Sequence, residues 1–206
     1  MGGPRNKGST RPPTTREPSA EARLKSSGGP DLLNVPDTYR EELAETLLRI
    51  HNELKVPWEA LPEGILIQDR KYIDRYSRKT TGTAVGETWA ITNGRSMMIS
   101  DRIFDASTVR TIAREGARGD KATGTPVGVI AHEIGHILWD RLGTRAQTFS
   151  ELAGASVSKY PDEWRPGTIR EMERFAEGFA ALATASPAST KLYADSMKWW
   201  LRAQEW

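Results

Sequence analysis

The sequence predicts an α+β fold, because β-rich segments between residues 64 and 100 are followed by segments whose apolar residues recur at helical spacing. The chain of 206 residues is long enough for one domain with a hydrophobic core and too short for two large ones. We therefore expect a short twisted sheet that packs on the later helices.

Residues 1–36 are rich in Gly, Pro, Ser, Thr and Arg and contain few large apolar side chains. Such a segment buries too little apolar surface to offset the entropy of ordering, so we expect a disordered leader over 1–36 and one folded domain over 37–206. Residues 1–30 carry six Lys or Arg against two Glu, a surplus of four in a chain of net charge +2, which leaves −2 on the remainder. We expect no nucleic-acid partner for this domain.

The first helix is expected over roughly residues 38–55, with Asp37 as its N-cap and Pro57 beyond its end. Its apolar stripe consists of Leu43, Leu47, Ile50 and Leu54. Another short helix is expected over about 105–115, followed by a polar loop at 116–125.

Short strands are expected between these helices. Residues 64–68 (GILIQ) have the composition of a short strand. Residues 83–104 contain two β-rich runs around Asn93-Gly94, a dipeptide typical of hairpin turns, so the segment SMMIS at 96–100 is expected to form a strand.

The later helices carry clear start and stop signals. Thr125 and Pro126 suit the N-cap and first residue of a helix of about 17 residues that Gly143 ends. Thr168 and Glu171 have the spacing of a capping box at the start of the next helix, and a last helix carries the C-terminal tryptophans.

The composition limits the chemistry that this chain can perform. Cysteine is absent, so disulfides and thiolate ligands are excluded, and any transition metal must be held by imidazole and carboxylate groups. The sequence contains neither a run of about 18 apolar residues nor the apolar core of a signal peptide. We expect no membrane segment and no membrane partner.

The segment GVIAHEIGHILWD at 128–140 places His132 and His136 one helical turn apart, so both can bind one metal ion. Glu133 stands about 100° further round, within reach of a water molecule on that ion, as a general base requires. Burying these polar groups among apolar neighbours is costly unless they have partners, and a metal ion supplies them. We favour this interpretation over a histidine pair that lies on the surface of the helix and binds no metal.

A hydrolytic zinc site usually has three protein ligands and one position for water. The fitting source of the third ligand is a carboxylate on the following helix, where Glu171, Glu173 and Glu177 lie. Glu173 and Glu177 share one flank of that helix, whereas Glu171 points about 160° away from Glu173. Only one of Glu171 and Glu173 can therefore be the ligand.

The segments HEIGH (132–136), VSKY (157–160) and ERFAEGFA (173–180) resemble the lethal-factor-like zinc metallopeptidases and their relatives in phages and mobile elements, over about residues 83–183. The first motif is shared by all H-E-x-x-H peptidases, so the second helix is the specific part. The resemblance implies a gluzincin with a minimal zincin-like α+β fold. It also implies an edge strand, here SMMIS (96–100), that binds extended peptide by strand addition.

The resemblance assigns further roles. The implied Zn2+ ligands are His132, His136 and Glu173. Glu133 would be the catalytic base, Glu177 would orient a ligand histidine, and Tyr160 would assist the oxyanion. Tyr160 lies farther from Glu173 than in the family, so residues 161–167 would be an insertion.

A second family, the peptidases of the phage-repressor-cleaving type, would choose Glu171 in place of Glu173. We expect a zinc-dependent endopeptidase that acts on a protein or peptide substrate without an organic cofactor, and that is cytoplasmic or virion-associated, with non-classical export left open. The alternatives are a slow or inactive metal-binding virion or accessory protein, and a narrow-target toxin or regulatory peptidase of this second type.

Overall fold

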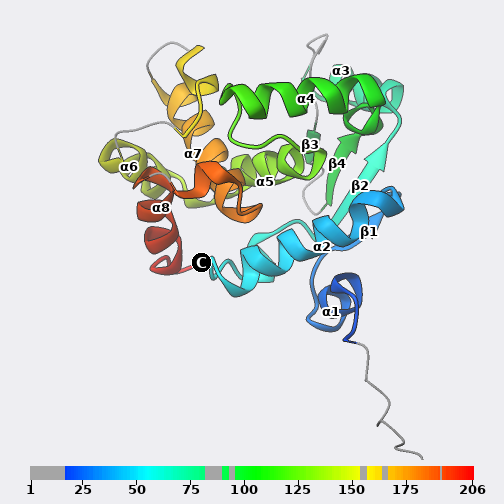
Figure 1. Ribbon diagram of the computed structural model, residues 1–206, viewed down its shortest axis with the longest axis horizontal. Helices are drawn as coiled ribbons and strands as arrows, with labels where there is room; N and C mark the ends of the chain where they lie inside the picture. Colours follow the sequence, from blue (N-terminus) through cyan, green and yellow to red (C-terminus); the bar gives the residue numbers. More distant parts are fainter. Residues whose placement is uncertain (1–16, 82–89, 93–95, 154–156, 164–166, 191) are drawn as a thin grey trace, which may run out of the picture.

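The structure is a computed structural model that describes residues 17–81, 90–92, 96–153, 157–163, 167–190 and 192–206. Within these residues the chain forms an α+β fold in which a small sheet lies to one side of a larger group of helices (Figure 1), so the predicted fold class is confirmed. The helices are α1 (Ala20–Ser26), α2 (Asp37–Asn52), α3 (Arg70–Thr81), α4 (Ala106–Arg118), α5 (Pro126–Leu142), α6 (Thr144–Ala153), α7 (Thr168–Ala183) and α8 (Leu192–Arg202). The strands are β1 (Asp31–Leu33), β2 (Gly64–Gln68), β3 (Ala90–Thr92) and β4 (Ser96–Ser100).

The described strands form one sheet in the order β1-β2-β4-β3. β1, β2 and β4 run parallel, and β3 pairs antiparallel with β4. The strands predicted at 64–68 and 96–100 are confirmed as β2 and β4. β3 and β4 pair as the arms of the predicted hairpin, while its Asn93-Gly94 turn lies outside the described residues.

The prediction that 96–100 is an edge strand is wrong, because β4 pairs with β2 on one side and with β3 on the other. Met97, Met98 and Ile99 are all buried, and a strand that is buried on both faces belongs in the interior of a sheet. Among the described strands, β3 and β1 form the two edges.

Part of the segment predicted as a disordered leader is folded. Residues 17–36 contain α1 and β1, and β1 extends the sheet by pairing with β2. Ala20 and Leu24 of α1 are buried, and a Glu41 carboxylate oxygen accepts a hydrogen bond from the Ala20 N–H at 2.6 Å. The low apolar content of this segment was misleading, because its few apolar side chains are buried against distant parts of the chain. Residues 1–16 lie outside the described residues.

The predicted helices are present, but two of their predicted caps are wrong, and α8 ends at Arg202, before Trp206. α2 begins at Asp37, after Pro36 at the N-cap position, without a side-chain cap. α7 begins at Thr168, but its N-cap is Gly167, so the capping box of Thr168 and Glu171 does not form. Gly167 has φ 135, which glycine adopts readily, and its carbonyl accepts a hydrogen bond from the Glu171 N–H. The sequence analysis did not predict α3 and α6.

α5 lies at the centre of the helices and contacts α2, α6 and α7 (Figure 1). The aromatic core includes Phe175 of α7, whose ring centroid lies 5.6 Å from that of Trp139 and 6.2 Å from that of Trp200. Trp199, the neighbour of Trp200, is 72% exposed. Among the described helices, none has the length and apolarity that a membrane span requires.

Candidate metal centre

α5 carries both candidate histidine ligands within the predicted boundaries. Thr125 is its N-cap and accepts a hydrogen bond from a backbone N–H of the first turn, which begins with Pro126. Gly143 follows the last residue at φ 57 and ends the helix. His132 and His136 project from one side of α5, with their ring centroids 4.7 Å apart.

A close crossing brings α7 against this side of α5. A Cβ atom on Gly135 would lie 2.8 Å from the Ala176 Cα and 3.3 Å from the Ala176 Cβ, so Gly135 contributes no side chain where it meets Ala176. His132 and His136 flank Gly135 on α5 in the same way that Glu173 and Glu177 flank Ala176 on α7. The crossing therefore brings the four polar side chains together inside the protein.

Three of these side chains converge as a group that could hold a metal ion. One ligand atom from each of His132, His136 and Glu173 lies within 4.8 Å of the others. The Glu173 Oε2 atom lies 3.2 Å from the His132 Nε2 and 3.7 Å from the His136 Nε2. Glu173 is only 6% exposed, yet its Oε2 forms no hydrogen bond of acceptable geometry with the described residues.

A buried carboxylate oxygen that faces two imidazole nitrogens in this way fits a metal ion, because two histidines and one glutamate are a familiar ligand set with one position left open. The structure places Glu173 in this group. Glu171, the alternative ligand, is not part of it. The physical reason is the helical periodicity that turns these two glutamates of α7 in opposite directions.

Glu177 holds His132 from the other side of the ring. Its Oε1 lies 2.9 Å from the His132 Nδ1, so an Nδ1–H group would leave the Nε2 lone pair for a metal ion. The Glu177 Oε2 accepts hydrogen bonds from the Ser158 hydroxyl and from the Ala122 N–H, both at 2.6 Å. Glu177 is 3% exposed, and its contacts with His132, Ser158 and Ala122 hold it in place.

The electrostatics of the centre favour positive charge between the histidines and the acids. Burial opposes ionisation of His132, but the close carboxylates of Glu173 and Glu177 outweigh it and raise the pKa of His132 to about 10. Burial, together with the charge of His132, lowers the pKa of His136 to about 4, which keeps this imidazole neutral. A divalent cation would profit from the same arrangement of acids.

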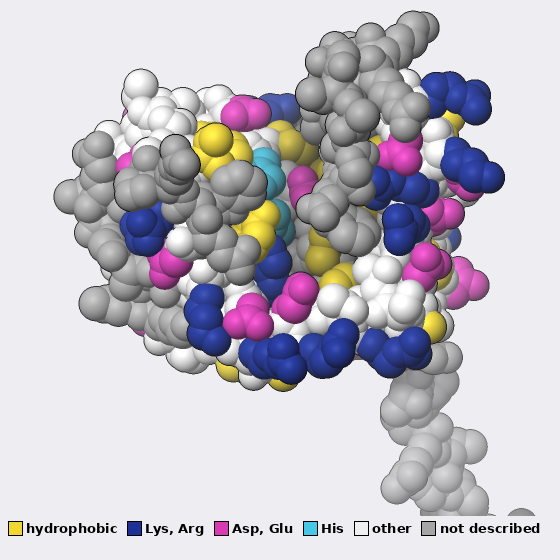
Figure 2. Space-filling view, turned by 90° about the horizontal axis from the view of Figure 1, so that it is seen from above, with side chains coloured by type: hydrophobic (Ala, Val, Ile, Leu, Met, Phe, Trp, Pro, Cys, Tyr) yellow, Lys and Arg dark blue, Asp and Glu magenta, His cyan; other side chains and the backbone are white. Residues whose placement is uncertain are grey.

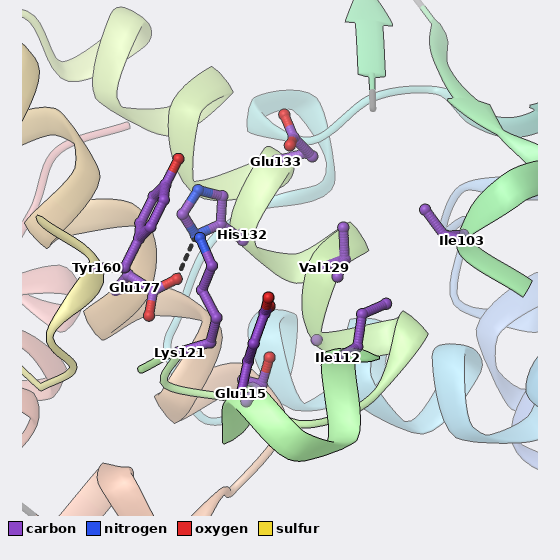
Figure 3. A pocket seen from close by; sticks show the side chains of 11 residues that line it. Ile103, Ile112, Glu115, Lys121, Val129, His132, Glu133, Tyr160 and Glu177 are labelled. Atoms are coloured by element: carbon purple, nitrogen blue, oxygen red, sulfur yellow. Dashed lines mark ion pairs between the residues drawn. The ribbon is translucent and has the colours of Figure 1, made fainter. Parts of the chain in front are cut away.

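A pocket of about 120 Å³ opens beside His132 between α4 and α5. In the view from above the orientation of Figure 1, histidine side chains are visible in a hollow of the surface (Figure 2). Glu133 lines the pocket on one side of His132, while Tyr160 and Glu177 lie on the other side (Figure 3). Burial raises the pKa of the Glu133 carboxyl, although His132 and Lys121 oppose this shift.

Tyr160 lines the pocket from η3 (Tyr160–Glu163). Its ring centroid lies 6.1 Å from that of His132. Backbone hydrogen bonds of 3.0 Å fix this segment, because the Lys159 and Tyr160 N–H groups donate to the Gly119 and Asp120 carbonyls. The segment after Tyr160 includes residues 164–166, which lie outside the described residues.

The sequence analysis missed two residues at this site. Lys121 lines the pocket and places its ammonium group over the Tyr160 ring, 2.6 Å from the ring centroid. No local sequence signal singled out Lys121, because a loop brings it to the site. Ser158, which donates to Glu177, belongs to the Ser-x-Tyr element that ends at Tyr160, so its spacing offered a signal.

The comparisons with known proteins give no match: no protein-family model matches the chain, and neither the search of curated proteins nor that of solved structures finds a significant similarity. The function therefore has to be argued from the residues of the centre.

Proposed function

We propose that the protein is a zinc-dependent peptidase, similar to the lethal-factor-like metallopeptidases, that hydrolyses peptide bonds in a protein or peptide substrate. One observation supports this proposal above all. A group of two histidines and one glutamate lies beside a pocket that also contains the carboxylate of Glu133. A purely structural metal site has no need of a base beside an open position.

The donor set supports zinc as the metal. His132, His136 and Glu173 offer two imidazole nitrogens and one carboxylate oxygen. Zinc binds such a set readily, whereas calcium and magnesium prefer oxygen ligands alone. Zinc bound there would supply Lewis acidity, which lowers the pKa of water and polarises a carbonyl group.

Glu133 would act as the general base and then as the general acid. Its carboxylate would take a proton from the attacking water and deliver this proton to the amine that leaves. The raised pKa of Glu133, which burial causes, brings its proton affinity closer to that needed for transfer near neutral pH.

Tyr160, Lys121 and Glu177 would act around this proton transfer. The Tyr160 hydroxyl would donate a hydrogen bond to the oxygen on which negative charge develops. Lys121 holds the Tyr160 ring from one face and adds positive charge to that side of the pocket. Glu177 would keep His132 in the orientation and tautomer that a metal ligand needs.

The decisive experiment measures bound zinc by mass spectrometry and cleavage of a quenched-fluorescence peptide library for the full chain and three variants. We expect Glu133→Ala to retain zinc and to lose cleavage activity. Glu173→Ala should lose both. Glu171→Ala is the matched control, because it removes a carboxylate from the same helix outside the metal-binding group, and it should retain both.

Loss of zinc in Glu171→Ala but not in Glu173→Ala would refute the ligand assignment. Zinc binding by the parent without cleavage of any peptide would favour the alternative, a metal-binding accessory protein. Equal activity of the parent and Glu133→Ala would exclude the proposed role of this base.

A further inference from the structure

The outer side of α4 carries three arginines close to the pocket. Arg110, Arg114 and Arg118 follow one another at four-residue spacing, which places them along one side of the helix over about 12 Å. All three are exposed, and we refer to them as the arginine stripe. Figure 2 shows a row of Lys and Arg side chains along one side of the hollow in which the histidines are visible.

The carboxylates near the arginine stripe are directed elsewhere. Glu115 lines the pocket on the inner side of α4, and Asp120 pairs with Lys159 at 3.1 Å. Within the part of the chain that the structure describes, no carboxylate forms an ion pair with the stripe. The Arg114 guanidinium donates one hydrogen bond to the Thr111 hydroxyl at 3.2 Å, which neutralises no charge.

α4 therefore has two functional sides. Ile112 and Glu115 form part of the pocket wall, and the arginine stripe lies on the side of the helix away from Ile112. A peptide that leaves the pocket across α4 would pass Glu115 and then reach the stripe. Residues 31–206 carry a net charge of −2, so attraction of an anionic molecule to this domain has to be local.

The spacing of the arginine stripe suits an extended peptide. Successive arginines are about 6 Å apart along the helix, and side chains on one side of an extended chain repeat about every 6.6–6.8 Å. The stripe contains no aromatic side chain on which nucleic-acid bases could stack. Its chemistry thus matches carboxylates on alternate residues of a peptide better than single-stranded nucleic acid.

We infer that the arginine stripe binds an acidic segment of the substrate, so that the peptidase selects proteins with Asp or Glu residues close to the scissile bond. This inference rests on the proposed function and specifies its substrate class. Arg110, Arg114 and Arg118 are specificity-determining residues in this scheme, because they touch the substrate outside the reacting bond.

The test uses the full chain with Glu133→Gln, which removes the proposed base, and two fluorescent peptides of equal length. One peptide carries Glu at alternate positions, and the other carries Gln. At low ionic strength we expect the acidic peptide to bind about tenfold more tightly, and salt at about 0.5 M should abolish the difference. Changing Arg110, Arg114 and Arg118 together to Gln should also abolish it.

A matched control removes three positive charges elsewhere on the surface. Lys25, Lys55 and Lys198 lie in α1, after α2 and in α8, away from α4 (Figure 1). Their joint change to Gln should leave the preference for the acidic peptide intact. Equal affinity of the two peptides for the Glu133→Gln protein, or an equal loss in both triple variants, would overturn the inference.

Two further outcomes separate this inference from the proposed function. If the parent cleaves both peptides with equal kcat/KM, the binding of acidic segments by the stripe is refuted, while the proposed peptidase activity is supported. If the parent binds the acidic peptide through the stripe but cleaves neither peptide, the proposed peptidase activity is contradicted instead. Tighter binding of a single-stranded oligonucleotide, lost in the stripe variant, would assign the surface to nucleic acid and overturn the inference.

Discussion

Gly135→Ala tests the helix crossing on which the metal centre depends. The new methyl carbon would lie 2.8 Å from the Ala176 Cα, a distance that backbone atoms cannot relieve by a rotamer change. Overpacking of this kind costs about 1–3 kcal/mol, whereas replacing glycine by alanine within a helix returns about 1 kcal/mol of helix propensity. We therefore expect a net fall of about 0–2 kcal/mol in the free energy of unfolding.

The same change should weaken metal binding, because separation of α5 and α7 moves Glu173 away from His132. Urea unfolding in the presence of a chelator measures the packing effect alone, and competition with a zinc-binding dye measures the affinity. Gly64→Ala is the matched control, since a Cβ atom there would make only ordinary contacts of 3.6 Å or more. A Gly135→Ala protein with unchanged stability and unchanged zinc affinity would refute the close crossing.

Four other changes test separate parts of the structure. Leu24→Ala should lower the free energy of unfolding by about 2–3 kcal/mol in urea titrations, because this buried side chain holds α1 to the domain. A negligible effect would contradict the packing of α1 on the rest of the domain. Thr125→Ala should cost about 1 kcal/mol by the same measurement, since it removes the N-cap of α5. Glu177→Gln should weaken zinc affinity about 10–100-fold in dye competition, and unchanged affinity would exclude its role in orienting His132. Tyr160→Phe should lower kcat with little change in KM, whereas a pure rise in KM would argue against oxyanion stabilisation.

The strongest expectations from the sequence concerned features with local causes. A single helix carries His132 and His136, and its boundaries follow from the nearby residues Thr125, Pro126 and Gly143. The opposite directions of Glu171 and Glu173 also follow from helical periodicity alone. From the sequence we could infer that only one of these glutamates is the ligand. The spacing of residues within one helix does not determine which side of that helix packs against another helix.

Contacts between distant segments decided the rest. Residues 17–36 have a leader-like composition, yet pairing of β1 with β2 and burial of Leu24 fold them into the domain. The position of 96–100 inside the sheet depends on two partner strands, and the residue pattern of one strand does not identify its neighbours. Lys121 comes to Tyr160 through a loop without a motif.

The amino-acid order by itself determined the type of ligands, their spacing along each helix and the absence of thiolate chemistry, because these depend on residue identity and on helical geometry over one or two turns. Only the tertiary structure decided that Glu173 faces the histidines and that Glu177 fixes His132. The physical reason is the contact of α5 and α7 at Gly135 and Ala176, which sets the rotation of one helix against the other.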